Sequence, residues 1–178
     1  MDKPKIYLET TVFNFYHENR RHGDYPKYRA QVRKLFDLIK AGEYEPFTSP
    51  VTFREIIREA DPVKREKMGD LVVDYGITVL GESDEVKRIA ALYIREKALG
   101  PACETDAMHI AMTTVNRLDF IVSLNFSHIA RPWTIEKVRQ VNMREGYNPI
   151  GIYRPAEVLE RYEDSAGLPE RSPDTERS

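Results

Sequence analysis

The stretch TDAMHIAMTTVNRLDFIVSLNFSHIARP, residues 105–132, holds the strongest indication of the fold. Its first part has helical periodicity, because Thr105 is a favourable helix cap and the apolar residues after it recur on one face. Its second part, Phe120–Leu124, is a short continuous apolar run, as expected of a strand covered on both faces. A helix that leads into a doubly covered strand predicts a parallel sheet with helices on both sides.

The same alternation of strand and helix patterns continues through the rest of the chain. The residue types of helix starts occur at Ser49–Pro50, Asp61–Pro62 and Ser83. In the usual doubly wound order, the first and fourth strands are neighbours. We therefore predict a three-layer α/β/α sandwich around a parallel sheet of about five short strands. The predicted strands are residues 6–12, 44–48, 77–80, 120–124 and 150–153, with a polar and aromatic loop at 14–25.

Length and composition indicate one globular domain in the cytoplasm. The 178 residues are 41% hydrophobic and 31% charged, and we predict a domain over residues 1–163 with a disordered polar tail at 164–178. No apolar run approaches the roughly 20 residues of a membrane span, and the N-terminus lacks the apolar segment of a signal peptide. The only cysteine, Cys103, can form no internal disulfide, which fits a reducing compartment.

Several functional classes are disfavoured by the sequence. The net charge of −2 argues against a globally basic nucleic-acid binder. Glycine-rich phosphate loops, the GxSxG elbow of hydrolases and motifs of paired metal-binding cysteines are all missing. Basic residues do cluster locally, and each cluster fits a solvated face better than a phosphate track; the clusters are Arg20–His22, Lys27 with Arg29, Arg33–Lys34 and Lys64–Lys67.

Polar side chains stand where the predicted strands end. Glu9 follows the first strand, Ser123 and Asn125 close the fourth, and Asp106 lies in the first turn of the helix before the fourth. These residues can converge on one sheet edge, with Glu55 reaching in from the helix after the second strand. Carboxylate and amide oxygens suit Mg²⁺ or Mn²⁺, which polarises a phosphodiester and activates water for its hydrolysis.

Each of these residues also has a purely structural explanation. Glu9 fits a surface charge at a strand end, and Glu55 fits an ion pair with a neighbouring arginine on a wet helix face. Asp106 is favoured in a first helical turn by the helix dipole alone. Asn125 can start a turn, and a lone helical histidine such as His109 is more often a hydrogen-bonded core residue than a catalyst.

Residues 105–132 resemble the C-terminal motif of PIN-domain proteins. There a DAxHxAxA helix leads to an Asp-aromatic-apolar strand that ends in (S/T)xN or (S/T)xD and is followed by Phe and His. The segments IYLETTVFNFY (6–16), SPVTFREI (49–56) and NPIGIYRPAEVL (148–159) are similar to the family's first strand, its helix with an inward Glu, and its closing strand and helix. The resemblance spans about residues 5–160 and is close to the branch grouped with VapC-like toxins.

This resemblance implies a Mg²⁺- or Mn²⁺-dependent ribonuclease that is often dimeric. It implies that Glu9, Glu55, Asp106 and Asn125 are catalytic and that the first three hold metal. Thr10, Ser123 and His109 take supporting positions. Two residues depart from the pattern, since Glu9 stands where Asp is usual and Asn125 where Asp is common.

Three functional hypotheses remain open on the sequence. The first is an endoribonuclease, and the second is a non-catalytic RNA-binding or regulatory module, which the departures at Glu9 and Asn125 motivate. The third is the toxin of a toxin–antitoxin pair, inhibited by a small antitoxin protein. The sequence leaves the oligomeric state open. A homodimer is one option, and the aromatic residues between Phe13 and Tyr28 could cover its surface.

Overall fold

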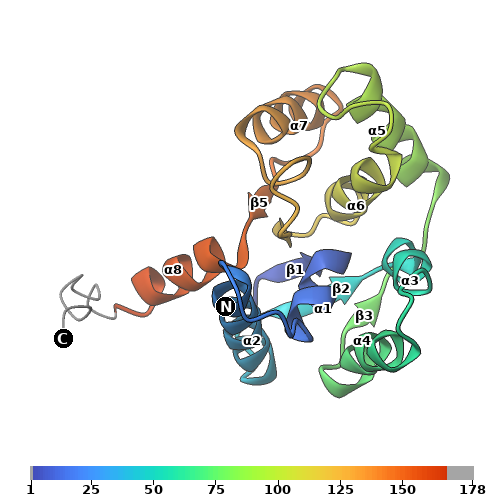
Figure 1. Ribbon diagram of the computed structural model, residues 1–178. Helices are drawn as coiled ribbons and strands as arrows, with labels where there is room; N and C mark the ends of the chain where they lie inside the picture. Colours follow the sequence, from blue (N-terminus) through green and yellow to red (C-terminus); the bar gives the residue numbers. More distant parts are fainter. Residues whose placement is uncertain (1, 168–178) are drawn as a thin grey trace.

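The computed structural model describes residues 2–167, which form eight helices and one parallel five-stranded sheet (Figure 1). The strands are β1 (Lys5–Leu8), β2 (Glu45–Thr48), β3 (Thr78–Val79), β4 (Phe120–Val122) and β5 (Gly151–Tyr153), in the order β3-β2-β1-β4-β5. The helices are α1 (Thr10–Tyr16), α2 (Tyr25–Lys40), α3 (Pro50–Ile56), α4 (Pro62–Asp74), α5 (Asp84–Arg95), α6 (Glu104–Val115), α7 (Pro132–Arg144) and α8 (Pro155–Ser165).

Helices cover both faces of the sheet, and each face has its own core. Successive side chains of a strand point to opposite faces, so β1 contributes to both cores. Tyr7 of β1 is buried in a core with α5, α6 and α7. Its neighbours Ile6 and Leu8 are buried in a second core with residues of α1, α2, α4 and α8. In Figure 1, α5, α6 and α7 accordingly gather on one side of the strands and α2 and α4 on the other. The predicted α/β/α sandwich with a parallel sheet of five short strands is confirmed.

The central strand β1 lies between β2 and β4. Tyr7 is in register with Phe47 on one side and with Ile121 on the other. The prediction that the first and fourth strands are neighbours in the sheet is therefore confirmed. The carboxyl ends of β1 and β4 meet at one edge of the sheet, where the Glu9 backbone N–H donates to the Val122 carbonyl at 3.2 Å.

Three predicted helix starts are confirmed by their capping hydrogen bonds. The Ser49 hydroxyl accepts from the backbone N–H of Val51 at 3.2 Å, and the Ser83 hydroxyl accepts from that of Val86 at 3.2 Å. The Asp61 carboxylate accepts from Val63 at 2.9 Å and also from the next backbone N–H. Each of these contacts satisfies a donor that the first turn of the helix leaves free.

The strand predicted at residues 6–12 and the loop predicted from residue 14 are wrong in part. β1 ends at Leu8, and the chain enters α1 through Glu9, whose backbone is extended with φ −81° and ψ 160°. The β-branched residues at positions 10–12 resemble a strand in sequence. The helix forms because it buries Phe13, whose ring packs edge-on against Phe36 of α2 at a centroid distance of 6.4 Å.

Two predicted boundaries are shifted. α6 begins at Glu104 with Cys103 at its N-cap position, so Thr105 lies in the first turn and is not the cap. Acidic side chains in that turn interact favourably with the helix dipole. At the other end of the chain α8 continues to Ser165, so the first residues of the predicted tail are helical. Residues 168–178 of that tail lie outside the described residues.

The aromatic residues predicted to cover a dimer surface pack within the chain. Phe13 is fully buried, and Phe15 stacks on Tyr25 at 6.2 Å and meets Tyr28 edge-on at 5.8 Å. The homodimer itself stays a prediction. Among residues 2–167, no helix combines the length and the apolar character needed to cross a membrane.

Candidate functional site

A cavity of about 380 Å³ opens at the carboxyl edge of the sheet, beside the ends of β1 and β4. The four residues predicted to be catalytic, Glu9, Glu55, Asp106 and Asn125, all line it. They come from four separate segments: the β1–α1 junction, α3, α6 and the loop after β4. The structure thus brings the predicted set together, while the catalytic role of its members stays a prediction.

Glu9 is a buried carboxyl that neighbouring hydroxyls hold in place. Its Oε2 accepts hydrogen bonds from Thr11 Oγ1 at 2.5 Å and from Ser123 Oγ at 2.9 Å. Burial raises the pKa of Glu9 above its ordinary value, against the opposing effects of His109 and of the two hydroxyls. An exposed strand-end charge is therefore ruled out for Glu9, because the side chain is almost entirely removed from water.

Glu55 is paired with a histidine and not with a neighbouring arginine. Its Oε2 accepts from Thr10 Oγ1 and contacts His109 Nε2 at 3.0 Å, whereas Arg54 pairs with Glu82. Burial favours the neutral carboxyl, but the hydrogen bonds and charge of His109, together with Thr10, outweigh it and lower the pKa of Glu55. Glu55 therefore stays ionised beside the cavity. Thr10 and His109 both contact it, and their supporting role in a reaction stays a prediction.

His109 is fully buried and belongs to a chain of hydrogen bonds that links α6 to β1 and to α3. Its Nδ1 lies 2.8 Å from the Tyr7 hydroxyl, which lies 2.7 Å from Ser49 Oγ. Because an ionised Glu55 can only accept, Nε2 donates to it, and Nδ1 shares a hydrogen bond with the Tyr7 hydroxyl. Burial raises the pKa of Tyr7, so its hydroxyl stays protonated. This chain fixes the orientation of the imidazole and, through it, of Glu55.

Asp106 is held from the opposite side of the cavity by the loop after β4. Its Oδ1 accepts from Asn125 Nδ2 at 3.1 Å, and its Oδ2 lies 2.9 Å from His128 Nδ1. The Asn125 backbone N–H donates to Ser123 Oγ at 2.9 Å, and the Asn125 side-chain oxygen accepts from the backbone of His128. Ser123 therefore supports both Glu9 and Asn125. Sequence reasoning did not assign His128 to the site, although it lies in the stretch at 105–132 that opens the sequence analysis.

The predicted metal ligands face the cavity from two sides. Ligand atoms of Glu9, Glu55 and His109 lie within 4.8 Å of one another, whereas Asp106 groups in the same way with Cys103 and His128. Within the described part of the chain, the hydrogen bonds to each glutamate fall on its Oε2, which leaves the Oε1 atoms for a ligand.

A further oxygen at the cavity has no hydrogen-bond partner. Asn14 of α1 lines the same cavity, and its buried Oδ1 is unpartnered among residues 2–167. A buried amide oxygen of this kind can accept a hydrogen bond or bind a cation. Sequence reasoning missed Asn14, because it was placed at the start of a loop. Carboxylate and amide oxygens around one cavity fit Mg²⁺ or Mn²⁺, which favour oxygen ligands.

Basic side chains lie close to the acidic cavity. Arg58 lines it directly. A neighbouring groove of about 290 Å³ runs from the end of α1 along α2 and α4. Its lining includes two acidic residues, Glu18 and Asp61, and five basic ones, namely His17, Arg29, Arg33, Lys64 and Lys67. Members of three basic clusters in the sequence thus come together in space. Fixed positive charge of this kind raises the local concentration of phosphate groups.

No protein-family model and no curated protein matches this chain. The chemistry of the site therefore has to be inferred from the side chains around the cavity.

Proposed function

We propose that the protein is a Mg²⁺- or Mn²⁺-dependent endoribonuclease of the PIN type, which hydrolyses phosphodiester bonds of RNA. The observation that supports this proposal is the convergence of Glu9, Glu55, Asp106 and Asn125 from four chain segments on one cavity of about 380 Å³. The resemblance of residues 105–132 to the PIN motif supplies the substrate class. A single cysteine and an RNA substrate both fit the cytoplasm.

The carboxylates of Glu9, Glu55 and Asp106 would hold the cation. When bound, a divalent ion supplies Lewis-acid polarisation of the phosphodiester and lowers the pKa of water. Glu55 remains ionised beside His109, so its oxygen can accept a hydrogen bond from the attacking water and orient it. Asn125 and Ser123 hold Asp106 and Glu9 by neutral hydrogen bonds. The neutral amide of Asn125 removes one charge from the set, which favours a single ion over two.

The basic groove gives the RNA backbone a path to the cavity. Asn14 of α1 lines the acidic cavity, and His17, at the C-cap of the same helix, lines the groove. On α4, Met68 lines the cavity and Lys64, one turn earlier, lines the groove. The two hollows therefore follow each other along the same pair of helices. A strand whose phosphates lie against the groove reaches the carboxylates with its next phosphodiesters.

A non-catalytic RNA-binding module is the second candidate, and the state of Glu9 favours it. A buried carboxyl with a raised pKa carries less negative charge for a cation. Asn125 supplies no charge at all. A module of this kind would use the basic groove for RNA and leave the acidic cavity without a role in turnover.

Metal-dependent cleavage separates the two candidates. Purified full-length protein is incubated with structured and single-stranded RNAs in Mn²⁺, Mg²⁺ or EDTA, and Mn²⁺ binding is measured by calorimetry on the same sample. We expect cleavage with either ion, none in EDTA, and saturable Mn²⁺ binding. RNA binding without turnover and without saturable Mn²⁺ binding would overturn the nuclease and support the binding module.

A further inference from the structure

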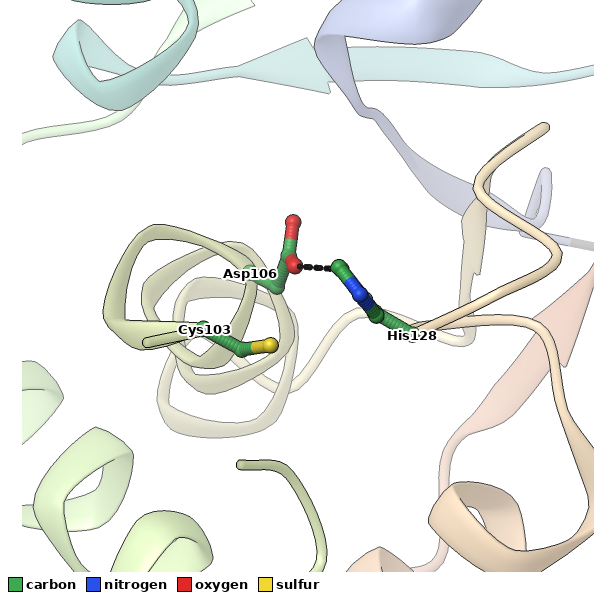
Figure 2. A group of neighbouring side chains, drawn as sticks. All are labelled: Cys103, Asp106 and His128. Atoms are coloured by element: carbon green, nitrogen blue, oxygen red, sulfur yellow. Dashed lines mark hydrogen bonds and ion pairs between the residues drawn. The ribbon is translucent and has the colours of Figure 1, made fainter. Parts of the chain in front are cut away.

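Three metal-ligating side chains meet at the start of α6, around the Oδ2 atom of Asp106, whereas Asn125 bonds to Oδ1. Cys103 stands at the N-cap position, Asp106 follows one turn later, and His128 reaches in from the loop between β4 and α7. Figure 2 shows the Cys103 sulfur below the Asp106 carboxylate and the His128 ring to its right. One ligand atom of each lies within 4.8 Å of the other two, and His128 Nδ1 is 2.9 Å from Asp106 Oδ2.

The chemistry of this group differs from that of the acidic cavity. A thiolate and an imidazole are ligands that Zn²⁺ prefers and that Mg²⁺ does not. Ligand atoms at zinc bond lengths lie roughly 3.3–3.8 Å apart across a tetrahedron. The Asp106–His128 pair, now 2.9 Å apart, would therefore open slightly to take an ion between them. The sulfur already lies within 4.8 Å of both partner atoms.

The position of the group also suits an ion from solution. The His128 side chain is 49% exposed and that of Asp106 is 15% exposed, and Cys103 is partly exposed. An ion can enter without unfolding of the chain. Three protein ligands leave the fourth tetrahedral position open for water or another small ligand, as in zinc sites that are not purely structural.

We propose that Cys103, Asp106 and His128 form a second metal site, selective for Zn²⁺ over Mg²⁺. The site goes beyond the proposed nuclease, because two of its three ligands have no part in the acidic cavity. It shares Asp106 with that cavity, so an ion bound to Oδ2 adds a positive charge next to the Oδ1 side. A bound zinc ion therefore weakens binding of a second divalent cation in the cavity, a consequence that rests on the proposed function.

Cobalt is a suitable probe, since Co²⁺ bound by a thiolate has a near-ultraviolet charge-transfer band that oxygen and nitrogen ligands do not give. Cys103 is the only cysteine, so this band in the full-length reduced protein reports on Cys103 alone. We expect a saturable band at one equivalent of Co²⁺, which Zn²⁺ removes stoichiometrically. Excess Mg²⁺ should leave the band in place and raise the Co²⁺ concentration needed for half-saturation.

Variants locate the other ligands. Cys103→Ser should abolish the band. His128→Ala should weaken Co²⁺ binding by at least about tenfold, the loss seen when even a supporting residue of a metal site is removed. His22→Ala, which removes an exposed histidine on the α1–α2 connection, should change nothing. Circular dichroism checks that each variant is folded.

Two results would overturn the zinc site: no charge-transfer band in the wild type at saturating Co²⁺, or full-strength binding in His128→Ala. A band that Mg²⁺ does not affect would overturn only the coupling to the acidic cavity. The zinc site and the nuclease can therefore fail separately.

Discussion

Asp106 Oδ1 accepts a hydrogen bond from Asn125 Nδ2 at 3.1 Å, and this contact joins the first turn of α6 to the end of β4. β4 pairs with β1, and β1 leads directly to Glu9. The contact therefore places the Asp106 carboxylate on the rim of the cavity that Glu9 also lines. Asp106 is a carboxylate and Asn125 is a neutral amide. The identities of these two residues therefore affect how much negative charge this edge of the sheet carries.

Replacement of Glu9 by glutamine should stabilise the protein near neutral pH. Burial raises the pKa of Glu9, so the stability that the neutral carboxyl contributes is present below the ordinary value of 4.5 and is lost as the pH rises through the folded-state pKa. The glutamine side chain of Glu9→Gln is neutral at every pH, so the variant does not lose this stability as the pH rises. In a chain of this length each kcal/mol regained raises Tm by about 2–4 °C, which thermal denaturation across a pH series will measure.

The same variant should lose stabilisation by metal. Saturating Mn²⁺ at a hundred times its Kd adds about 2.7 kcal/mol to a protein that binds it only when folded. We expect this gain in the wild type and in Glu160→Gln, an exposed control on α8, and little of it in Glu9→Gln. A Tm for Glu9→Gln below that of the wild type near neutral pH would contradict the electrostatic account of this residue.

The Tyr7 hydroxyl should matter for both stability and metal binding. Tyr7→Phe leaves His109 Nδ1 buried without its hydrogen-bond partner, which costs about 1–3 kcal/mol in urea denaturation. Since His109 orients Glu55, Mn²⁺ affinity should also fall by about tenfold or more.

Tyr93→Phe is the matched control for Tyr7→Phe. Tyr93 is equally buried, and its hydroxyl bonds to Thr114 and Asn142 away from the cavity. This variant should lose a similar amount of stability and keep its Mn²⁺ affinity. Equal Mn²⁺ affinities for the two variants would show that the Tyr7–His109 contact does not act on the site.

Lys67 should bind RNA phosphate. Lys67→Ala removes one charge from the groove along α1 and α4, so KM should rise with little change in kcat. The slope of log affinity against log salt should decrease by about 0.7 for one phosphate contact on a single strand. Lys137→Ala on α7, where the ammonium lies over Trp133, is the control and should leave both quantities unchanged. Identical salt slopes for the wild type and Lys67→Ala would exclude the groove as the RNA path.

Most of the fold could be predicted because helix starts have strong local signatures. Ser49, Asp61 and Ser83 each precede a helix that the structure contains. The α1 helix was missed since its first residues are β-branched and only Glu9 separates it from β1. Its formation depends on burial of Phe13 against α2, a contact that local sequence does not reveal.

The candidate site could be predicted as far as sheet topology determines it. Neighbouring parallel strands bring Glu9 and Asn125 to one edge whatever the details of the loops. The partners of His109 and His128 could not be predicted in the same way. His109 Nδ1 meets a tyrosine 102 residues earlier in the chain, and His128 depends on the path of the loop after β4. Cys103 has no partner cysteine, so its grouping with Asp106 appears only in three dimensions.

Cleavage of RNA by Asp106→Asn tests the central claim most directly. The substitution is isosteric, keeps an oxygen to accept from Asn125, and removes one charge from the proposed cation ligands. With Mn²⁺ present, we predict that the cleavage rate falls by at least about a hundredfold, as when one electrostatic catalytic group is lost. Asp164→Asn on α8 should match the wild type, and all three proteins should unfold cooperatively. Wild-type cleavage by a folded Asp106→Asn protein would contradict the assignment of this cavity as a nuclease site.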